Sequence, residues 1–277
     1  MRPQAAALPP IRVANTVTQL GPEDRGAVLV AGSHGGLIAA HLAARGGAHA
    51  AIFNDAGVGC DNAGIAGLDL LGAIGMAAAT VSHLSARIAD GADGLAHGVI
   101  SHVNAPAAAC GVHAGQRCRD AGECLRRAPA PQGEPLPYPE GRFALLPRSV
   151  AKGLPAVWGL DSIGKVLPGD AGRILIIGSH GGLHGGDPDS ALPVAAAAAI
   201  FHDAGRGKDG ASLTRLPVLA GRGMPAGVVD YRSARIGDAR SMWETGWISA
   251  WNAPAAERGL RVGIAVREAV TLLRRGT

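Results

Sequence analysis

The chain has 277 residues, of which 47% are hydrophobic and only 3% aromatic, with 42 glycines and a formal charge of +4. Its length suits one large domain or two ordinary ones, and its basic residues are too scattered to form a nucleic-acid surface. No apolar stretch approaches the ~20 residues of a membrane span, and the N-terminus lacks the apolar core of a signal peptide, so we expect a cytoplasmic protein away from membranes. The four cysteines lack CxxC spacing and are expected to be free thiols.

The chain contains an internal duplication. Residues 28–36 recur as 174–182, and residues 51–115 align without gaps on 199–263, with 30 identities in 65 positions. Self-similarity of this extent indicates two copies of one structural unit. The boundaries that we predict are a first repeat at 13–115, a Pro/Gly-rich linker or wrapping arm at 116–158, a second repeat at 159–263 and a C-terminal helix at 264–277.

Within each repeat, short apolar runs alternate with helical patterns. In chain order, the first repeat predicts a strand at 27–31, a turn at 32–36, a helix at 37–45, a strand at 50–53, a helix at 63–75, a strand at 77–82, a helix at 88–97 and a strand at 99–103. Continuous apolar strands alternating with helices indicate a parallel sheet that is covered on both faces. The predicted fold class is therefore α/β: two tandem homologous repeats, each a small parallel-sheet unit of flavodoxin or Rossmann type, related by pseudo-two-fold symmetry.

Every polar motif of the duplication follows a predicted strand. Ligands of open α/β sheets bind outside the carboxyl ends of the strands. We therefore expect the motifs to meet in a cleft between the repeats.

The first motif is Gly-Ser-His-Gly-Gly, at 32–36 and again at 178–182. At a strand-to-helix turn, its glycine amides would form an anion-binding nest that could also hold a developing oxyanion. The histidines would transfer protons, and the serines are candidate nucleophiles. The alternative is helix capping by Ser with glycines for turn geometry, which leaves the histidines unexplained. The residues concerned are Ser33, His34, Gly35 and Gly36, and Ser179, His180, Gly181 and Gly182.

A strand ending in Ser-His-Gly, followed by a helix and a strand ending in Asp-Ala, resembles the catalytic His and Cys elements of caspase-fold peptidases. In that family a nucleophilic Cys would stand where this chain has Ala56 or Gly57, and Ala204 or Gly205 in the second copy. The resemblance covers two short elements without the nucleophile, so we do not assign the chain to that family.

Aspartates follow the next strand of each repeat. Asp55 and Asp203 come directly after the strand and are candidates to orient a histidine, to act as a general base or to bind a divalent cation. Their neighbours differ between the copies, so that a shared site would be asymmetric. His202 and Lys208 occur only in the second copy and are candidate substrate-binding residues.

The sequence Ser-Ala-Arg-Ile occurs in both repeats. Arg87 and Arg235 could hold a carboxylate through their planar guanidinium groups, with Ser85 and Ser233 beside them. The alternative is an internal ion pair with the aspartate three residues later, which would fix the loop. Asn104 and Asn252 could contact ligand, although helix capping is the favoured role.

These motifs favour an enzyme that acts on a small, polar, carboxylate-bearing molecule, with hydrolysis of an amide-type C–N bond as the leading hypothesis. A metal-assisted lyase or isomerase is the first alternative, and a non-catalytic ligand-binding protein is the second. No nucleotide-binding motif is present, so we expect no organic cofactor; a divalent metal stays open, although no tight ligand spacing predicts a metal site. A small-molecule substrate and a homo-oligomer are the expected partners.

Overall fold

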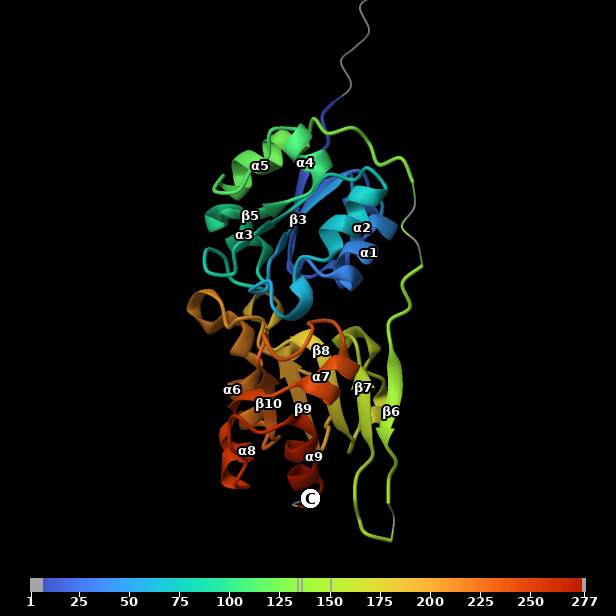
Figure 1. Cartoon of the computed structure of the whole chain (residues 1–277), viewed down its shortest axis with the longest axis vertical. Helices are drawn as coiled ribbons and strands as arrows, with labels where there is room; N and C mark the ends of the chain where they lie inside the picture. The colour runs from blue at the N-terminus through green and yellow to red at the C-terminus, as the bar shows by residue number, and fades with distance from the viewer. Residues whose placement is uncertain (1–6, 134, 136, 150, 276–277) are drawn as a thin grey trace, which may run out of the picture.

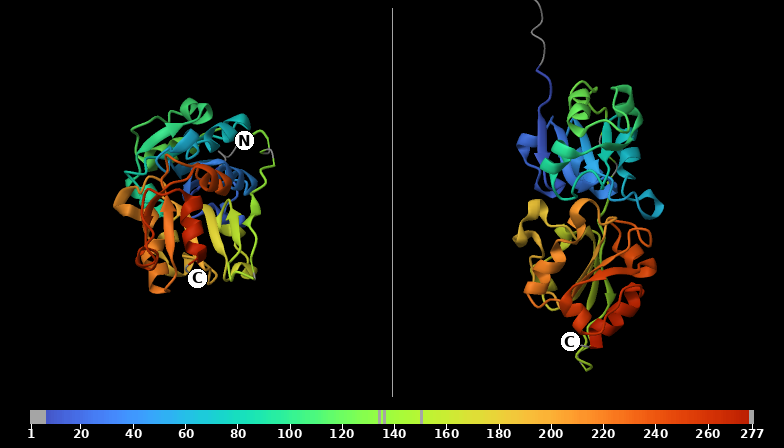
Figure 2. Two further views of the ribbon diagram at one scale, coloured as in Figure 1. Left: turned by 60° about the horizontal axis from the view of Figure 1, so that its bottom comes forward. Right: turned by 90° about the vertical axis from the view of Figure 1, so that its left-hand side faces the viewer.

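The structure is a computed structural model that describes residues 7–133, 135, 137–149 and 151–275. It contains two sheets, one in each half of the chain, stacked end to end along the long axis of the molecule (Figures 1 and 2). The sheets are mostly parallel and helices cover both faces, so the predicted α/β class is confirmed. None of the helices in the described ranges is long and apolar enough to cross a bilayer.

The first sheet has five strands in the order of the chain. They are β1 (Ile11–Ala14), β2 (Val28–His34), β3 (Ala50–Asn54), β4 (Ala78–Val81) and β5 (Ile100–Val103). The central strands consist of short apolar runs and are buried throughout, as expected for a sheet that is covered on both faces. Two helices cover one face, α1 (Leu37–Arg45) and α2 (Gly67–Ala73). Three helices lie on the other side, α3 (Gly91–His97), α4 (Ala105–Ala109) and α5 (Cys118–Leu125).

The second sheet has the same parallel core and an additional edge strand. Its strands are β6 (Arg142–Leu146), β7 (Val157–Leu160), β8 (Ile174–His180), β9 (Ala198–His202), β10 (Ala226–Val229) and β11 (Ile248–Trp251). Its helices are α6 (Arg215–Gly221) on one face, and α7 (Ala239–Thr245), α8 (Ala253–Glu257) and α9 (Val266–Arg275) on the other.

The last strand of each half is antiparallel, which the alternating pattern did not predict. The amide of Ser82, just after β4, donates to Val99 O, and Asp230 N donates to Trp247 O in the same way. These bonds hold the chain at the carboxyl edge of the sheet. Strands β5 and β11 therefore begin at that edge and run antiparallel to β4 and β10.

The segment predicted as a linker is more structured than its composition suggested. It contains helix α5 and edge strand β6. Between them the proline-rich residues 129–133, 135 and 137–141, here called the strap, lie along the side of the molecule from the first half to the second (Figure 1). Gln132 N donates to Ile74 O near the upper end of the strap, and Gly141 N donates to Asp161 Oδ2 at 2.6 Å at its lower end.

The carboxyl edges of the two sheets face each other. Between them lies an apolar cluster of Ala56, Ala63, Ile88, Ala204, Ala211 and Ile236. Two backbone bonds join equivalent positions in opposite directions, Cys60 N to Tyr231 O at 2.8 Å and Lys208 N to His83 O at 2.7 Å. The polar motifs therefore meet at the junction of the two halves.

Candidate functional site

A small pocket of about 190 Å³ opens at this junction, beside His34. Its floor comes from the start of α1 and from the loop before α2, and its opposite wall comes from the Ser-Ala-Arg-Ile loop of the other half. Tyr138 of the strap lies across one side. Its lining residues are His34, Leu37, Ile38, Asp61, Ala63, Ala66, Tyr138, Arg235, Ile236, Gly237 and Asp238.

His34 contributes a neutral imidazole to this pocket. Its Nδ1 accepts a hydrogen bond from Gly36 N at 3.1 Å, so in the neutral ring the proton is on Nε2. Burial, and to a smaller extent His202, lowers the pKa of His34 from 6.5 to about 4. No described residue forms a hydrogen bond with Nε2. At neutral pH the Nε2–H of His34 is therefore a hydrogen-bond donor without a described partner.

Arg235 forms the charged rim of the pocket. It donates through Nη1 to Asp61 Oδ2 at 2.9 Å, and through Nε and Nη2 to Asp238 Oδ2 at 3.1 and 2.9 Å. The two carboxylates raise the pKa of Arg235 further above its usual value. Three of the five guanidinium N–H groups are used, which leaves two for a ligand. Arg235 therefore forms the ion pair that the sequence suggested and still has donors for the ligand contact.

The corresponding space in the second half is bounded by different elements. No α-helix follows β8; short 3₁₀ turns at His184–Gly186 and Pro188–Ser190 take the place of α1. The His184 ring lies 6.3 Å from that of His180, and Gly185 N donates to Ala89 O at 2.8 Å, closing the gap to the opposite loop. The helix that we predicted after the second Gly-Ser-His-Gly-Gly motif is therefore absent, because Gly185, Gly186 and Pro188 interrupt it.

A buried arginine occupies the space left by that helix. Arg215 is fully buried and donates to the carbonyls of Ser190 and Ala191, and burial lowers its pKa to about 10. Burial and this cation also lower the pKa of His184 to about 4, and burial, followed by Arg215, lowers that of His180 well below its usual value. The junction therefore has unequal sides, with the open pocket at His34.

The glycine amides of the repeated motif are already used. Gly35 N donates to Asn54 O and Gly181 N to His202 O, while Gly36 N and Gly182 N donate to the preceding histidines. The anion-binding nests that we predicted are therefore not open to a ligand, since the chain's own acceptors hold these donors. The glycines serve close packing instead: a Cβ at Gly35 would lie 2.9 Å from Gly64 O.

The two candidate nucleophiles hold the preceding loops. Ser33 Oγ accepts from Val17 N at 3.0 Å, and Ser179 Oγ accepts from Ile163 N at 2.9 Å. Neither serine lines the pocket at His34.

The candidate aspartates lie beside the junction and hold the loops after β4 and β10. Asp55 Oδ1 accepts from Gly57 N and from both the backbone N and Nδ1 of His83, the latter at 2.9 Å. These bonds lower the pKa of Asp55 against the opposing effect of its burial. Asp203 accepts from Tyr231 N and from Ser249 Oγ. His83 was not among the predicted residues; its position after β4, opposite Tyr231 in the repeat, was the available signal.

Asn54 and His202 occupy aligned positions in the two halves, and their side chains form corresponding hydrogen bonds. Asn54 accepts from Ala56 N and donates to Ala86 O, and His202 accepts from Ala204 N and donates to Ala234 O. His202 is buried and lies among backbone partners, as do Asn104 and Asn252. Each of these asparagines accepts an amide at the start of the following helix and donates to two carbonyls near α2 or α6, the capping role that we favoured.

Of the remaining predicted residues, Arg87 and Lys208 join the two halves, and the two serines fix their own loops. Arg87 Nη1 bonds Asp209 across the junction at 3.1 Å, and Lys208 Nζ bonds both carboxylate oxygens of the buried Asp93. Ser85 and Ser233 donate to the carbonyls three residues earlier and accept the amides of Val99 and Trp247, and so fix their loops.

Tyr138 was not predicted to take part, because nothing in a proline-rich segment indicates which side chain returns to the core. Among the described residues, no three His, Cys, Asp or Glu side chains are grouped so as to hold a metal ion, and all four cysteines are free. No protein-family model, curated protein or solved structure matches this chain.

Proposed function

We propose that the chain binds a small polar molecule in the pocket at His34 and hydrolyses an amide C–N bond of that molecule. The observation that carries this proposal is the neutral imidazole of His34, which has an Nε2–H without a described partner at a pocket between two halves. The pocket is smaller than the ~300–1,000 Å³ of drug-sized sites, which favours a ligand of a few heavy atoms.

The polar groups around the pocket suit an amide that also carries a carboxylate. The two spare N–H groups of Arg235 would hold the carboxylate, and His34 Nε2–H would donate to the amide oxygen as negative charge develops on it. Asp61, whose side chain is 64% exposed, would accept a proton from water. The water oxygen then bonds to the carbonyl carbon, the C–N bond breaks, and the nitrogen leaves as ammonia or an amine after taking that proton.

The asymmetry of the junction supports a single site. We further propose that the repeats arose by duplication and are related by a pseudo-two-fold axis, and that the site was kept at His34 and filled at His180. Reciprocal contacts such as Arg87–Asp209 and Arg235–Asp61 support this relation.

The test is ammonia release from oxamate, malonamate and acetamide by the wild type and three variants. His34→Ala should lower kcat/KM by about 100-fold, the usual effect of removing one donor to a developing oxyanion. His34→Asn should keep activity within about tenfold, because an amide can supply the same acceptor and donor, as Asn54 does for His202. The matched control, His180→Ala, should change little.

A pocket-narrowing variant separates binding from hydrolysis. Gly237 has φ +79, and its counterpart Ala89 has a φ of +65, so the backbone accepts Gly237→Ala. The new Cβ would stand 3.6 Å from His34 Cε1. If the three compounds raise the Tm of the wild type but not of this variant, and no ammonia forms, the non-catalytic binding alternative is correct. If no compound raises the Tm and none is hydrolysed, the proposal is wrong.

A further inference from the structure

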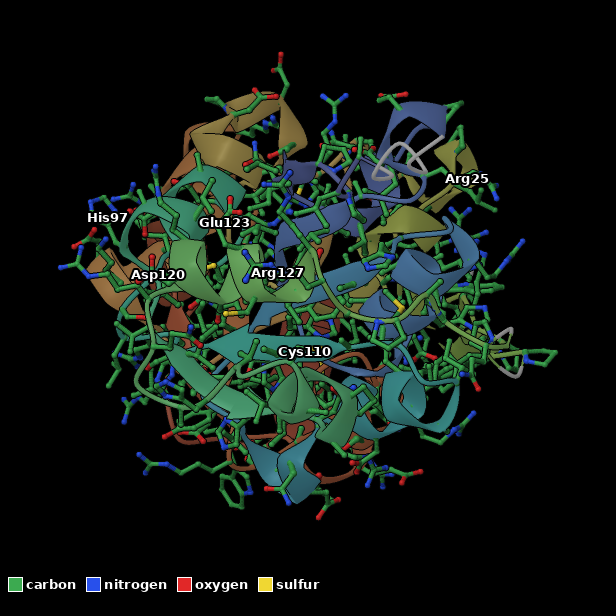
Figure 3. All side chains as sticks on the ribbon, turned by 90° about the horizontal axis from the view of Figure 1, so that it is seen from above. Arg25, His97, Cys110, Asp120, Glu123 and Arg127 are labelled. Carbon is green, nitrogen blue, oxygen red and sulfur yellow. The ribbon has the colours of Figure 1, made fainter. Side chains whose placement is uncertain are left out.

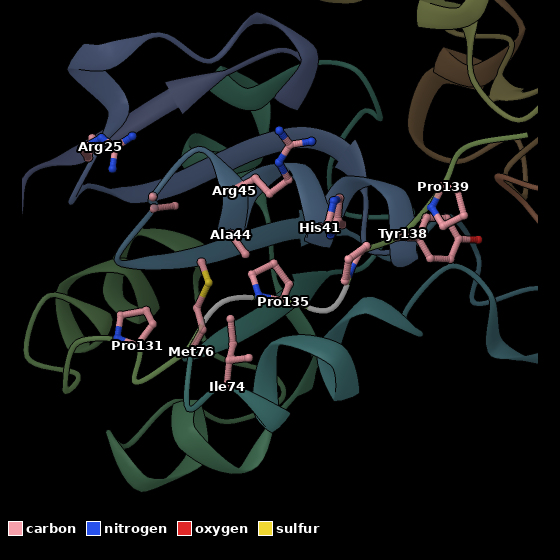
Figure 4. A pocket seen from close by; sticks show the side chains of 14 residues that line it. Arg25, His41, Ala44, Arg45, Ile74, Met76, Pro131, Pro135, Tyr138 and Pro139 are labelled. Atoms are coloured by element: carbon pink, nitrogen blue, oxygen red, sulfur yellow. The ribbon is translucent and has the colours of Figure 1, made fainter.

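A larger cavity, of about 710 Å³, lies on the outer side of the first half. It is bounded by the end of α1, by the turn after α2 and by the strap (Figure 4). Among the described lining residues, Tyr138 alone is common to this cavity and to the pocket at His34. Its volume falls in the range of sites for drug-sized ligands.

Most of the cavity wall is apolar. Ala44, Ile74 and Met76 line it together with prolines of the strap, of which Pro135 lies beside Met76 and Ile74 (Figure 4). Proline has no backbone N–H and a fixed φ, so this part of the wall is stiff and offers no amide donor. The strap is anchored at its two ends by the bonds described above, from Gln132 N to the Ile74 carbonyl and from Gly141 N to the Asp161 carboxylate. An apolar body would therefore find a preformed space.

The charged residues among the described lining of the cavity are both basic. Arg25 and Arg45 line it, and no described lining residue is acidic. Arg25 extends over Gly47, where an added Cβ would be 3.1 Å from its Cγ and 3.2 Å from its Nη1. Neither arginine forms an ion pair with a described residue. Both guanidinium groups are thus available to an anion.

We propose that this cavity is a second binding site, for an amphipathic organic anion with a carboxylate head and an apolar body. The head meets Arg45, whose planar guanidinium group matches a carboxylate, and Arg25 adds a second positive charge at the border of the cavity. The body lies between Met76 and the prolines of the strap. This site is separate from the chemistry proposed at His34, and the two proposals can fail independently.

The test is binding of the fluorescent apolar anion 1-anilinonaphthalene-8-sulfonate to the full chain, with octanoate and octylamine as competitors. Octanoate should displace the probe and octylamine should not, because their tails match and only the head charge differs. Arg45→Glu should weaken probe binding about tenfold or more, and Arg45→Lys should retain most of it, since it keeps the charge. Ala44→Phe should abolish binding by filling the cavity.

The control for net charge is Arg127→Glu, which makes the same change at an exposed position just after α5, on the opposite face of the sheet (Figure 3). It should leave binding unchanged, and circular dichroism should show that each variant is folded. Equal losses in Arg127→Glu and Arg45→Glu, equal competition by octylamine, or full binding by folded Ala44→Phe would each overturn the proposal.

Discussion

His34 and His180 occupy equivalent places in the repeat but have different surroundings. His34 is next to an open pocket, whereas His180 faces His184 with the guanidinium of Arg215 nearby. Both rings use Nδ1 to cap the following glycine turn, so that part of their role is structural. Neither ring has a described hydrogen-bond partner at Nε2, so the two histidines differ in the residues around them, which lie outside the motif.

The depressed pKa of His34 makes the stability of the fold dependent on pH. Folded His34 stays neutral down to about pH 4, whereas in the unfolded chain it takes up a proton near pH 6.5. The unfolded state therefore binds more protons between these values, and the free energy of unfolding falls as the pH falls through this window. His34 alone should account for a loss of about 3 kcal/mol.

Denaturant unfolding of the wild type and His34→Asn at pH 7, 6, 5 and 4 measures this contribution. Asparagine keeps the cap on Gly36 but cannot be protonated, and the other buried histidines are present in both proteins. The difference between the two curves should grow as the pH is lowered and become constant below about pH 4. Parallel curves would show that His34 titrates normally in the folded protein.

The strand-to-helix turn after β2 is held by close backbone contacts. A Cβ at Gly35 would meet Thr80 Cγ2 at 2.7 Å and Gly64 O at 2.9 Å, and the carbonyl belongs to backbone that cannot rotate away. We expect Gly35→Ala to lower the free energy of unfolding by about 1–3 kcal/mol, the usual cost of overpacking. Gly221 in α6 has no atom within 4 Å of an added Cβ, so Gly221→Ala should instead be neutral or stabilising by up to about 1 kcal/mol.

Thermal unfolding of these two variants separates packing from glycine flexibility. If Gly35→Ala were as stable as Gly221→Ala, the turn would have more space than the structure gives it. The comparison also bears on the pocket, because Gly35 and Gly36 set the position at which α1 begins.

At the level of the elements, the sequence predicted the parallel core correctly, because short continuous apolar runs such as Ala50–Asn54 are typical of strands that are buried on both faces. It underestimated β2, which continues through His34, since Gly-Ser-His carries no apolar signal although it still pairs with β3. The site was predicted only in part. His34 and Arg235, both candidates from the sequence, line the pocket at the junction, whereas the positions of Tyr138 and Arg215 depend on tertiary contacts that no local pattern encodes.

At the scale of the whole molecule, the two halves form reciprocal contacts through a small apolar junction. Ile88 is 4% exposed there, in the cluster that contains Ile236 and residues from both halves. The exposed salt bridges around it contribute little individually, so the apolar contacts and the backbone bonds should hold the halves together. We therefore expect the wild type to unfold in one transition.

Ile88→Asp tests that cooperativity, because it places a carboxylate without a partner between the halves. Each half keeps its own sheet and helices, so calorimetry of the variant should resolve two transitions, the lower one below the wild-type Tm. The control is Leu84→Asp, which introduces the same charge in the same loop at a side chain that is 71% exposed, and which should keep the single transition. A single transition in both variants, at the wild-type temperature, would mean that the halves are coupled through the strap and the edge contacts and not through this junction. The shape of the pocket at His34 would then depend more on Tyr138 than on the packing of the two halves.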